Sequence, residues 1–385
     1  MKKFFSKKSL IAAALLVSAI GVGGVSSHAY AATPASALTQ DLSMKNASIS
    51  ELDNDTRVFA VDSSIEAKNV TFQNHFGIDV AAHLYLPADF DDSKQYAAVV
   101  ITGPFGAVKE QSSGLYAQEL AKNGFVAMAF DPSTTGESGG TRRDVGSPEL
   151  FTEDYHAAVD FVTNLSFVDP ERVGVMGICG LSGMAITAAT SDARIKAVAT
   201  SAMYDMSESI SRHYKGDYYT PEQRKIVLEH LASVRDQEAK SGEQIVGYHE
   251  LPVLADGTVP VADKLFPDEL PTDADPVTTE FFNYYVGRAN HPRSINSRFA
   301  WDGTTPYGFF DFKLMDNIDK LDVPVLMITG SAAHSKYFTD DVMAKIPGEN
   351  KREIVVLGAT HTDLYDQMDK IPFDDLVAFY RENLK

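Results

Sequence analysis

A single cysteine stands where this 385-residue chain passes from a strand into a helix. The apolar residues Val173–Met176 are followed at 177–183 by the sequence GICGLSG. This pattern is typical of a nucleophile elbow, in which a strained turn projects one side chain above the edge of a sheet. Glycines on both sides of Cys179 leave room for such a turn. A thiol at the apex predicts nucleophilic catalysis through a covalent intermediate.

Cys179 is the only cysteine, so the chain can form no internal disulfide and no cysteine-based metal site. A lone cysteine is usually a small buried hydrophobic residue, but its place at the apex of an elbow favours the nucleophile. Ser182 is an alternative nucleophile, disfavoured because it falls in the first turn of the following helix. No histidines show a metal-ligand spacing such as H-E-x-x-H, so we expect neither a metal nor a cofactor.

A thiol nucleophile needs a base, and His361 follows the last apolar run, IVVLG at 354–358. A histidine in the loop after the last core strand can take the thiol proton, or pair with the thiolate, and later protonate the leaving group. His361 could also be an ordinary loop histidine. Its position downstream of an elbow favours the catalytic interpretation.

The acid that would orient His361 is missing from its usual loop. The residues after the strand at 323–330 read SAAHS, and no carboxylate follows until Asp340. Asp205, just after the strand at 195–201, is the candidate in its place, since the order Cys179, Asp205, His361 still gives nucleophile, acid and base. Asp205 could equally cap a helix or form an ion pair.

Backbone N–H groups are expected to stabilise the oxyanion. One would belong to Gly180, directly after the nucleophile, and the other to Phe105 or Gly106 in the loop TGPFG at 102–106. Glu110 lies further along the same loop, and two roles are open for it. Its side chain could lie near the thiol, or its charge could complement the dipole at the start of a helix.

The elements that must position these groups alternate along the chain. A hairpin is predicted around Gly77 at 70–87. Buried strands are predicted at 97–102, 125–130, 172–178, 195–201, 323–328 and 354–357, and helices at 111–123, 148–164, from the elbow to about 190, and at 373–383. This alternation predicts an α/β fold with a mostly parallel sheet and helices on both faces. The core then comprises residues 64–205 and 322–385, and residues 206–321 form a cap insertion with a charged helix at 221–240 and an aromatic-rich part.

The amino terminus has the features of a secretory signal. Four lysines precede an apolar run, and the sequence Ala-Tyr-Ala at 29–31 fits a cleavage site. Residues 1–31 are therefore predicted to be a signal peptide and 32–63 a leader of uncertain order, which implies an exported protein, periplasmic or extracellular. The formal charge of −19 disfavours nucleic acid as a partner, and no later apolar run suits stable membrane insertion. The oligomeric state stays open.

Five sequence pieces in order carry a family resemblance: GPFGxxKEQ, FDPSxxGESGG, GICGxxGMA, SAMYDM and GATHTDLYD. Together they resemble α/β-hydrolases related to dienelactone hydrolase, in particular a bacterial exported branch, over residues 70–385. The resemblance implies an α/β-hydrolase fold, a cysteine nucleophile at Cys179 and a base at His361. It also implies a glutamate that contacts the resting thiol, for which Glu110 is the counterpart. The chain departs from the family at Leu181, where the family has glycine, and at His334, where its acid would stand.

These observations predict a cofactor-independent hydrolase that cleaves a carboxylic ester, thioester or lactone of a small-molecule substrate through an acyl-cysteine. The aromatic insertion should shape a largely apolar pocket. An Xaa-Pro-type peptidase is one alternative. A binding protein that has lost catalysis but kept the pocket is another, favoured by the missing acid and opposed by the intact Cys179 and His361.

Overall fold

The computed structural model describes residues 44–212, 219–261 and 264–385. The predicted signal peptide and the first part of the leader lie outside these residues. In the remainder of the leader, β1 (Ser48–Glu51) pairs antiparallel with β2 (Glu66–Gln73), so part of this segment joins the main sheet. Ser48–Glu51 is short and polar, and nothing in its pattern predicted a strand. Within the described residues, no helix combines the length and apolarity needed to cross a membrane.

The main sheet has nine strands in the order β1-β2-β3-β5-β4-β6-β7-β10-β11. The pairs from β5 to β11 are parallel and the three pairs at the other edge are antiparallel. The remaining strands are β3 (Asp79–Leu86), β4 (Tyr96–Thr102), β5 (Val126–Phe130), β6 (Val168–Ile178), β7 (Ile195–Ser201), β10 (Val325–Gly330) and β11 (Lys351–Val356). The sequence-based expectation of a mostly parallel sheet is confirmed.

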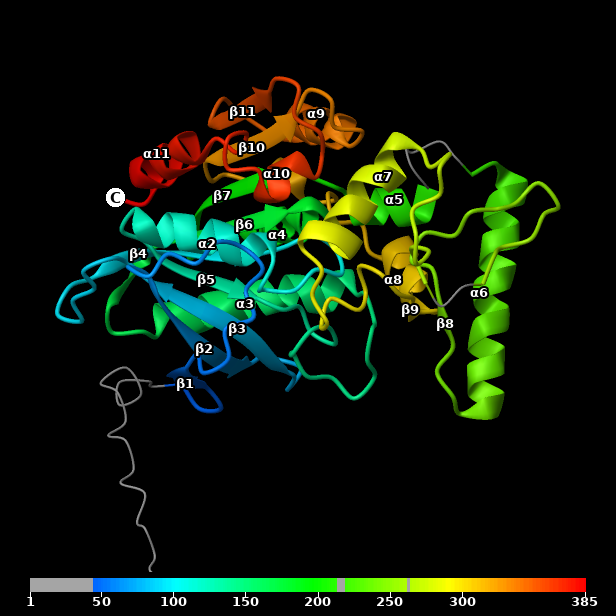
Figure 1. The fold of residues 1–385 in the computed structure, drawn as a ribbon, viewed down its shortest axis with the longest axis horizontal. Coiled ribbons are helices and arrows are strands. Elements are labelled where there is room, and N and C mark those ends of the chain that lie inside the picture. The colour runs from blue at the N-terminus through cyan, green and yellow to red at the C-terminus, as the bar shows by residue number, and fades with distance from the viewer. Residues whose placement is uncertain (1–43, 213–218, 262–263) are drawn as a thin grey trace, which may run out of the picture. The chain divides into compact units, whose positions relative to one another are not determined.

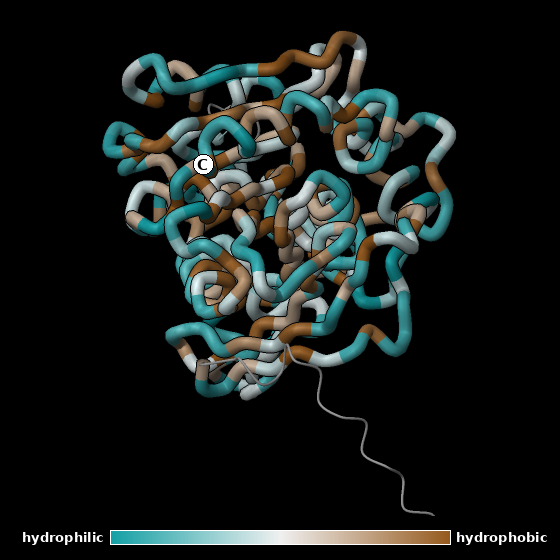
Figure 2. The backbone as a smooth tube through the Cα atoms, turned by 90° about the vertical axis from the view of Figure 1, so that its left-hand side faces the viewer, coloured by the Kyte–Doolittle hydropathy of each residue, from teal (hydrophilic) through white to brown (hydrophobic). Residues whose placement is uncertain are grey.

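Helices cover both faces of this sheet (Figure 1). Along β4, Ala98 and Val100 pack in one hydrophobic core and Val99 and Ile101 in the other. The first core is closed by α3 (Pro148–Thr163) and α4 (Ser182–Ala189), and the second by α2 (Ser112–Lys122) and α11 (Phe373–Asn383). A strand buried on both faces reads as a continuous apolar run, which explains why the core strands were visible in the sequence. In Figure 2 many hydrophobic stretches of the backbone run through the interior.

The long insertion lies between β7 and β10 and belongs to the same compact unit as the sheet, Ala37–Lys385. Figure 1 shows its helices gathered on one side of the sheet. The charged helix α6 (Pro221–Ser241) starts with a capping box of Thr220 and Gln223 and ends at Gly242, which has a left-handed φ of 73°. The other helical segments and strands of the insertion are α5 (Met206–Arg212), β8 (Val246–Gly247), α7 (Pro276–Phe282), the π-helical η2 (Asn283–Arg288), β9 (Trp301–Asp302), α8 (Thr305–Asp311) and the 3-10 turn η3 (Ile318–Lys320).

Candidate active site

Cys179 sits at the apex of the turn that joins β6 to α4, through the short 3-10 segment η1 (Cys179–Leu181). Its φ of 54° is left-handed, which is strained for a residue other than glycine. Gly177 allows the turn, because a Cβ there would lie 2.4 Å from the Cα of Ser182. Ser182 is buried and its hydroxyl donates to the Gly177 carbonyl at 3.0 Å, which ties it to the turn. The backbone therefore has the form of a nucleophile elbow with the thiol at its apex.

Two backbone N–H groups point at the sulfur, those of Gly180 and Phe105. Gly106, the alternative to Phe105, is not among the groups that act on the thiol; its φ is 85°, and a Cβ there would meet the Asn296 backbone at 2.6 Å. Among the oxyanion candidates, the structure thus brings Phe105 and Gly180 to the thiol. Donors converging at one point can stabilise negative charge that develops beside the nucleophile.

Burial raises the pKa of the Cys179 thiol to about 11, although hydrogen bonds from Tyr365, Gly180 and Phe105 act in the opposite direction. At neutral pH the side chain of Cys179 is consequently a thiol rather than a thiolate. Of the two roles predicted for His361, this protonation state is compatible with removal of a proton from the thiol rather than with pairing to a preformed thiolate.

We expect alkylation of Cys179 by iodoacetamide to be slow at pH 7 and to rise with pH toward about 11, because only the thiolate reacts. At pH 7 the folded protein should react roughly 10²-fold more slowly than the protein in denaturant, where the thiol has its ordinary pKa. Cys179 is the only thiol, so intact mass measures this rate directly. A folded-state rate that is already maximal near pH 6 would show a stable thiolate and contradict the prediction.

His361 is buried, and both of its ring nitrogens are engaged. Nε2 lies 2.8 Å from the hydroxyl of Tyr365, and Nδ1 lies 2.6 Å from the Oγ of Ser335. Tyr365 in α10 (Asp363–Asp366) also hydrogen-bonds Cys179. The structure therefore joins the predicted nucleophile and base through a phenol rather than directly. Burial, and to a lesser degree His334, hold the pKa of His361 well below its usual value, so its imidazole is neutral at pH 7.

Asp205 is not brought to His361. Its Oδ1 accepts hydrogen bonds from the N–H groups of Ser207 and Glu208, at 3.0 and 3.1 Å, and from the Ser207 hydroxyl. The carboxylate thus caps the first turn of α5, which is the alternative that the sequence left open. The partner of His361 Nδ1 is instead Ser335, in the loop that follows β10. A hydroxyl there can fix the tautomer but does not offer the negative charge that a carboxylate gives to an imidazolium.

A carboxylate–histidine–phenol chain lies beside the hydroxyl–histidine–phenol chain of Ser335, His361 and Tyr365. His334 Nδ1 is 3.0 Å from the Oε1 of Glu280, and its Nε2 is 2.6 Å from the hydroxyl of Tyr204. The rings of His334 and His361 lie 4.9 Å apart, centroid to centroid. Although burial opposes it, hydrogen bonds from His334 and the Thr362 N–H lower the pKa of Glu280. The insertion thus supplies, from α7, the carboxylate that is absent from the loop after β10.

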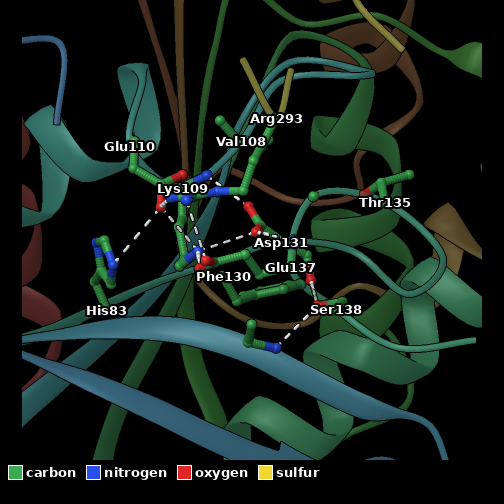
Figure 3. Close-up of polar contacts among 12 residues, drawn as sticks. His83, Val108, Lys109, Glu110, Phe130, Asp131, Thr135, Glu137, Ser138 and Arg293 are labelled. Atoms are coloured by element: carbon green, nitrogen blue, oxygen red, sulfur yellow. Dashed lines mark hydrogen bonds and ion pairs between the residues drawn. The ribbon is translucent and has the colours of Figure 1, made fainter. Parts of the chain in front are cut away.

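Glu110 does not contact the thiol. Its Oε1 lies 2.9 Å from the Nζ of Lys109 and pairs with Arg293, and both Glu110 and Lys109 are buried. Lys109 also bonds Asp131 at 3.1 Å, and Arg293 bonds Glu137 at 3.1 Å (Figure 3). The contact with the thiol that the family resemblance implied is not present. We call these five residues the buried charge cluster, after the buried Lys109, Glu110 and Asp131 at its centre; Arg293 is half-buried and Glu137 is exposed. Arg293 comes from the insertion, so the cluster fastens the insertion to the loops after β4 and β5.

A cavity of about 200 Å³ opens above Cys179. Its walls come from the loop after β4, the residues after β7 and the insertion, so residues of the insertion lie beside Cys179. The lining residues are Phe105, Cys179, Tyr204, Met206, His249, Glu250, Leu265, Phe266, Phe281, Tyr285, Asn296 and Ser297. A small, mostly aromatic cavity with a few polar groups at the nucleophile is typical of a binding site for a small molecule.

The aromatic residues of the insertion divide into two groups. Phe281 and Tyr285 line the cavity. Tyr284 and Trp301 are 1% and 0% exposed and pack in the cores, and the Trp301 ring stacks on Phe105 at 4.2 Å. The sequence grouped all of them as pocket aromatics, and the structure separates pocket walls from packing residues. Within the described ranges, no group of histidine, cysteine, aspartate and glutamate has the arrangement of a metal site.

Comparison with known proteins gives one family model and several relatives. The model of X-Pro dipeptidyl-peptidase (S15 family) matches residues 77–251. A Pseudomonas aeruginosa protein, PA2218, is 44% identical over 330 residues, which are 85% of this chain and 84% of that protein. Its crystal structure superposes with a TM-score of 0.79 and covers 86% of this chain and 98% of that chain.

Two further proteins are similar over the fold or over part of the chain. The α/β-hydrolase GrgF from Penicillium sp. sh18 superposes with a TM-score of 0.65 at 17% identity, over 83% of this chain and 99% of that chain, a likeness of fold alone. The thiohydrolase aneE from Aspergillus aculeatus is 34% identical over 129 residues, which are 34% of this chain and 39% of that protein.

Proposed function

We propose that this chain, which belongs to the α/β-hydrolase superfamily, hydrolyses carboxylic thioesters or esters, lactones included, through an acyl intermediate on Cys179. The observation that carries the proposal is the position of the sulfur. It lies at the apex of a strained elbow, opens onto a cavity, and is faced by the N–H groups of Phe105 and Gly180. That arrangement suits attack on a carbonyl carbon and stabilisation of the resulting oxyanion.

In the proposed reaction the thiol proton moves through Tyr365 to His361 as sulfur attacks. The phenol hydroxyl of Tyr365 lies between the sulfur and Nε2 and can donate to either one; in the transfer it donates to Nε2 while the thiol donates to the phenol oxygen, and Nδ1–H donates to Ser335. The new C–S bond forms a tetrahedral oxyanion at the two backbone N–H groups. The bond to the leaving group then breaks, and the proton on Nε2 goes to the leaving atom. Water afterwards attacks the acyl-cysteine, and the same groups return the thiol.

In the part of the chain that the structure describes, both ring nitrogens of His361 meet hydroxyl groups rather than a carboxylate, which favours substrates with good leaving groups. Burial holds the pKa of His361 low, and Ser335 supplies no charge to stabilise the imidazolium that forms on this histidine. A thiolate or an activated alkoxide can leave with little help, whereas an amine must be protonated strongly. The thiohydrolase relative agrees with this substrate class. We therefore place thioesters and activated esters ahead of amides.

A second candidate, an Xaa-Pro-type peptidase, is supported by the family model that matches residues 77–251. Both candidates are tested in one experiment. The purified protein is given a butyryl thioester, p-nitrophenyl butyrate and Ala-Pro-p-nitroanilide, and rates are measured together with the intact mass after rapid acid quench. We expect turnover of the first two and a transient butyryl adduct on the protein. Faster cleavage of the anilide would favour the peptidase, and no turnover or adduct with any substrate would favour a ligand-binding protein.

The proposal includes export. Its support is the lysine-rich amino terminus, the apolar run and the Ala-Tyr-Ala at 29–31. Amino-terminal sequencing of the protein secreted by a bacterial host should begin at Ala32. Recovery of the uncleaved chain from the cytosol alone would remove export from the proposal.

A further inference from the structure

Among the described residues that line the cavity above Cys179, one belongs to the acidic and basic types Asp, Glu, Lys and Arg, and it has a carboxylate. Glu250 lies in the insertion after β8 and lines the cavity. The Ser209 hydroxyl donates to its Oε1. Among the described lysines and arginines, none forms an ion pair with Glu250, although the same residues form many ion pairs elsewhere. The negative charge therefore meets no protein cation in the part of the cavity that the structure describes.

The residue beside Glu250 does not neutralise it. His249 also lines the cavity, and burial lowers the pKa of His249, an effect that the charge of Glu250 opposes only in part. The imidazole is thus neutral at pH 7. Its Nδ1 is buried and has no hydrogen-bond partner among the described residues. A neutral imidazole and an unpaired carboxylate side by side offer two acceptor sites to a ligand with several N–H donors.

The remaining walls suit a cation as well. Phe105, Phe281 and Tyr285 present aromatic rings to the cavity, and aromatic faces attract ammonium groups. Glu250 also lies within electrostatic reach of the nucleophile, since its charge is one of the influences on the Cys179 thiol. Glu250 is half-buried, and a partly desolvated carboxylate interacts more strongly with an opposite charge than a fully exposed one.

We propose that this cavity binds a substrate group bearing a positively charged amine, held by Glu250 against the aromatic walls. The inference rests on the proposed function in one respect, because it takes the bound amine to be part of a substrate. The binding of the amine itself can be measured without turnover. It specifies the substrate class: an acyl or leaving group with an ammonium a short chain away from the reacting carbonyl. Substrates that carry a carboxylate at that position are expected to be repelled by Glu250.

Calorimetric titration of the whole protein with n-hexylammonium, 1-hexanol and hexanoate tests the binding step. We expect hexylammonium to bind at least about tenfold more tightly than hexanol, as a charge-assisted contact predicts, and hexanoate to bind more weakly than either. In Glu250→Gln the advantage of hexylammonium over hexanol should fall below about threefold. The matched control is Glu208→Gln, which removes the same charge from a carboxylate of α5 that does not line this cavity and should keep the wild-type ratio.

Equal affinity for hexylammonium and hexanol, or an advantage that survives in Glu250→Gln, overturns the inference. A loss of that advantage in Glu208→Gln also overturns it, since attraction by the acidic surface as a whole would then explain the binding. A companion measurement compares kcat/KM for matched 6-aminohexanoyl and heptanoyl thioesters, where we expect a preference of at least about tenfold for the amine. Turnover without that preference refutes the amine site and leaves the proposed function standing. Amine binding without turnover supports the amine site and refutes the proposed function.

Discussion

Replacing Cys179 by alanine is expected to lower thioester turnover by about 10⁴-fold or more, to the level that the oxyanion groups and binding alone can support. The sulfur is the atom that forms the covalent bond, and no other nucleophile lies at the apex of the elbow. The measurement is kcat/KM for a butyryl thioester, together with the disappearance of the butyryl adduct in the intact mass. Loss of turnover with persistence of the adduct would place the nucleophile elsewhere.

Ser182→Ala provides the matched control. Its hydroxyl donates to the Gly177 carbonyl and is buried beneath the turn, so its removal should cost about 1 kcal/mol of stability and leave turnover within a few-fold of wild type. Thermal unfolding of both variants separates loss of chemistry from loss of fold. Wild-type turnover in Cys179→Ala with inactivity in Ser182→Ala would reverse the assignment of the nucleophile.

His361→Asn is expected to lower turnover by roughly 10³-fold and Tyr365→Phe by roughly 10²-fold, because each removes one step of the path from thiol to base. The reduction should be larger for an alkyl ester than for a thioester, since the alkoxide needs the proton from His361 more than a thiolate does. Rates for both substrates across pH 6 to 9 would show this split, which a purely structural defect would not produce.

Tyr380→Phe is the control for removing a buried phenol. The Tyr380 hydroxyl donates to the Val175 carbonyl at 2.7 Å, away from the cavity, and its loss should change stability without changing the ratio between the two substrates. If Tyr365→Phe is faster than wild type, the phenol separates thiol and imidazole rather than connecting them, and the proton relay is wrong.

The core was predictable because its elements have strong local signals. The runs at 97–102 and 195–201 are continuous and apolar, as strands covered on both faces must be, and they match β4 and β7 within a residue. The elbow could be read from glycine spacing alone, since the turn leaves no room for a Cβ at Gly177. By contrast, β1 is short and depends on β2 for its pairing, so no local pattern marks it, and α7 is marked only at its start, where Asp275 caps the helix before Pro276.

The site was predictable only in part, because several of its contacts join residues that lie far apart in the sequence. Asp205 begins the stretch Asp-Met-Ser-Glu, a pattern that favours helix caps, and chain order alone gave it a catalytic role instead. Tyr365 stands one helical turn after His361, a spacing that allows contact but does not require it. Glu280 reaches His334 across 54 residues, and Glu110 meets Arg293 across 183, so neither partner could be inferred from nearby sequence.

The buried charge cluster limits how far the insertion can be treated as an interchangeable module. Without Arg293, the core would keep the carboxylates of Glu110, Asp131 and Glu137 around a single ammonium, that of Lys109. Removing one partner of a fully buried pair typically costs about 3 to 5 kcal/mol; Arg293 is partly exposed, so its loss should cost less, but it still removes a cation from the buried carboxylate of Glu110. A chimera that exchanges residues 206–321 for the insertion of a relative must therefore inherit an arginine in this place, and shortening the insertion must stop before it. In this chain, the segment that lines the cavity also carries the arginine that pairs with the carboxylates of the core.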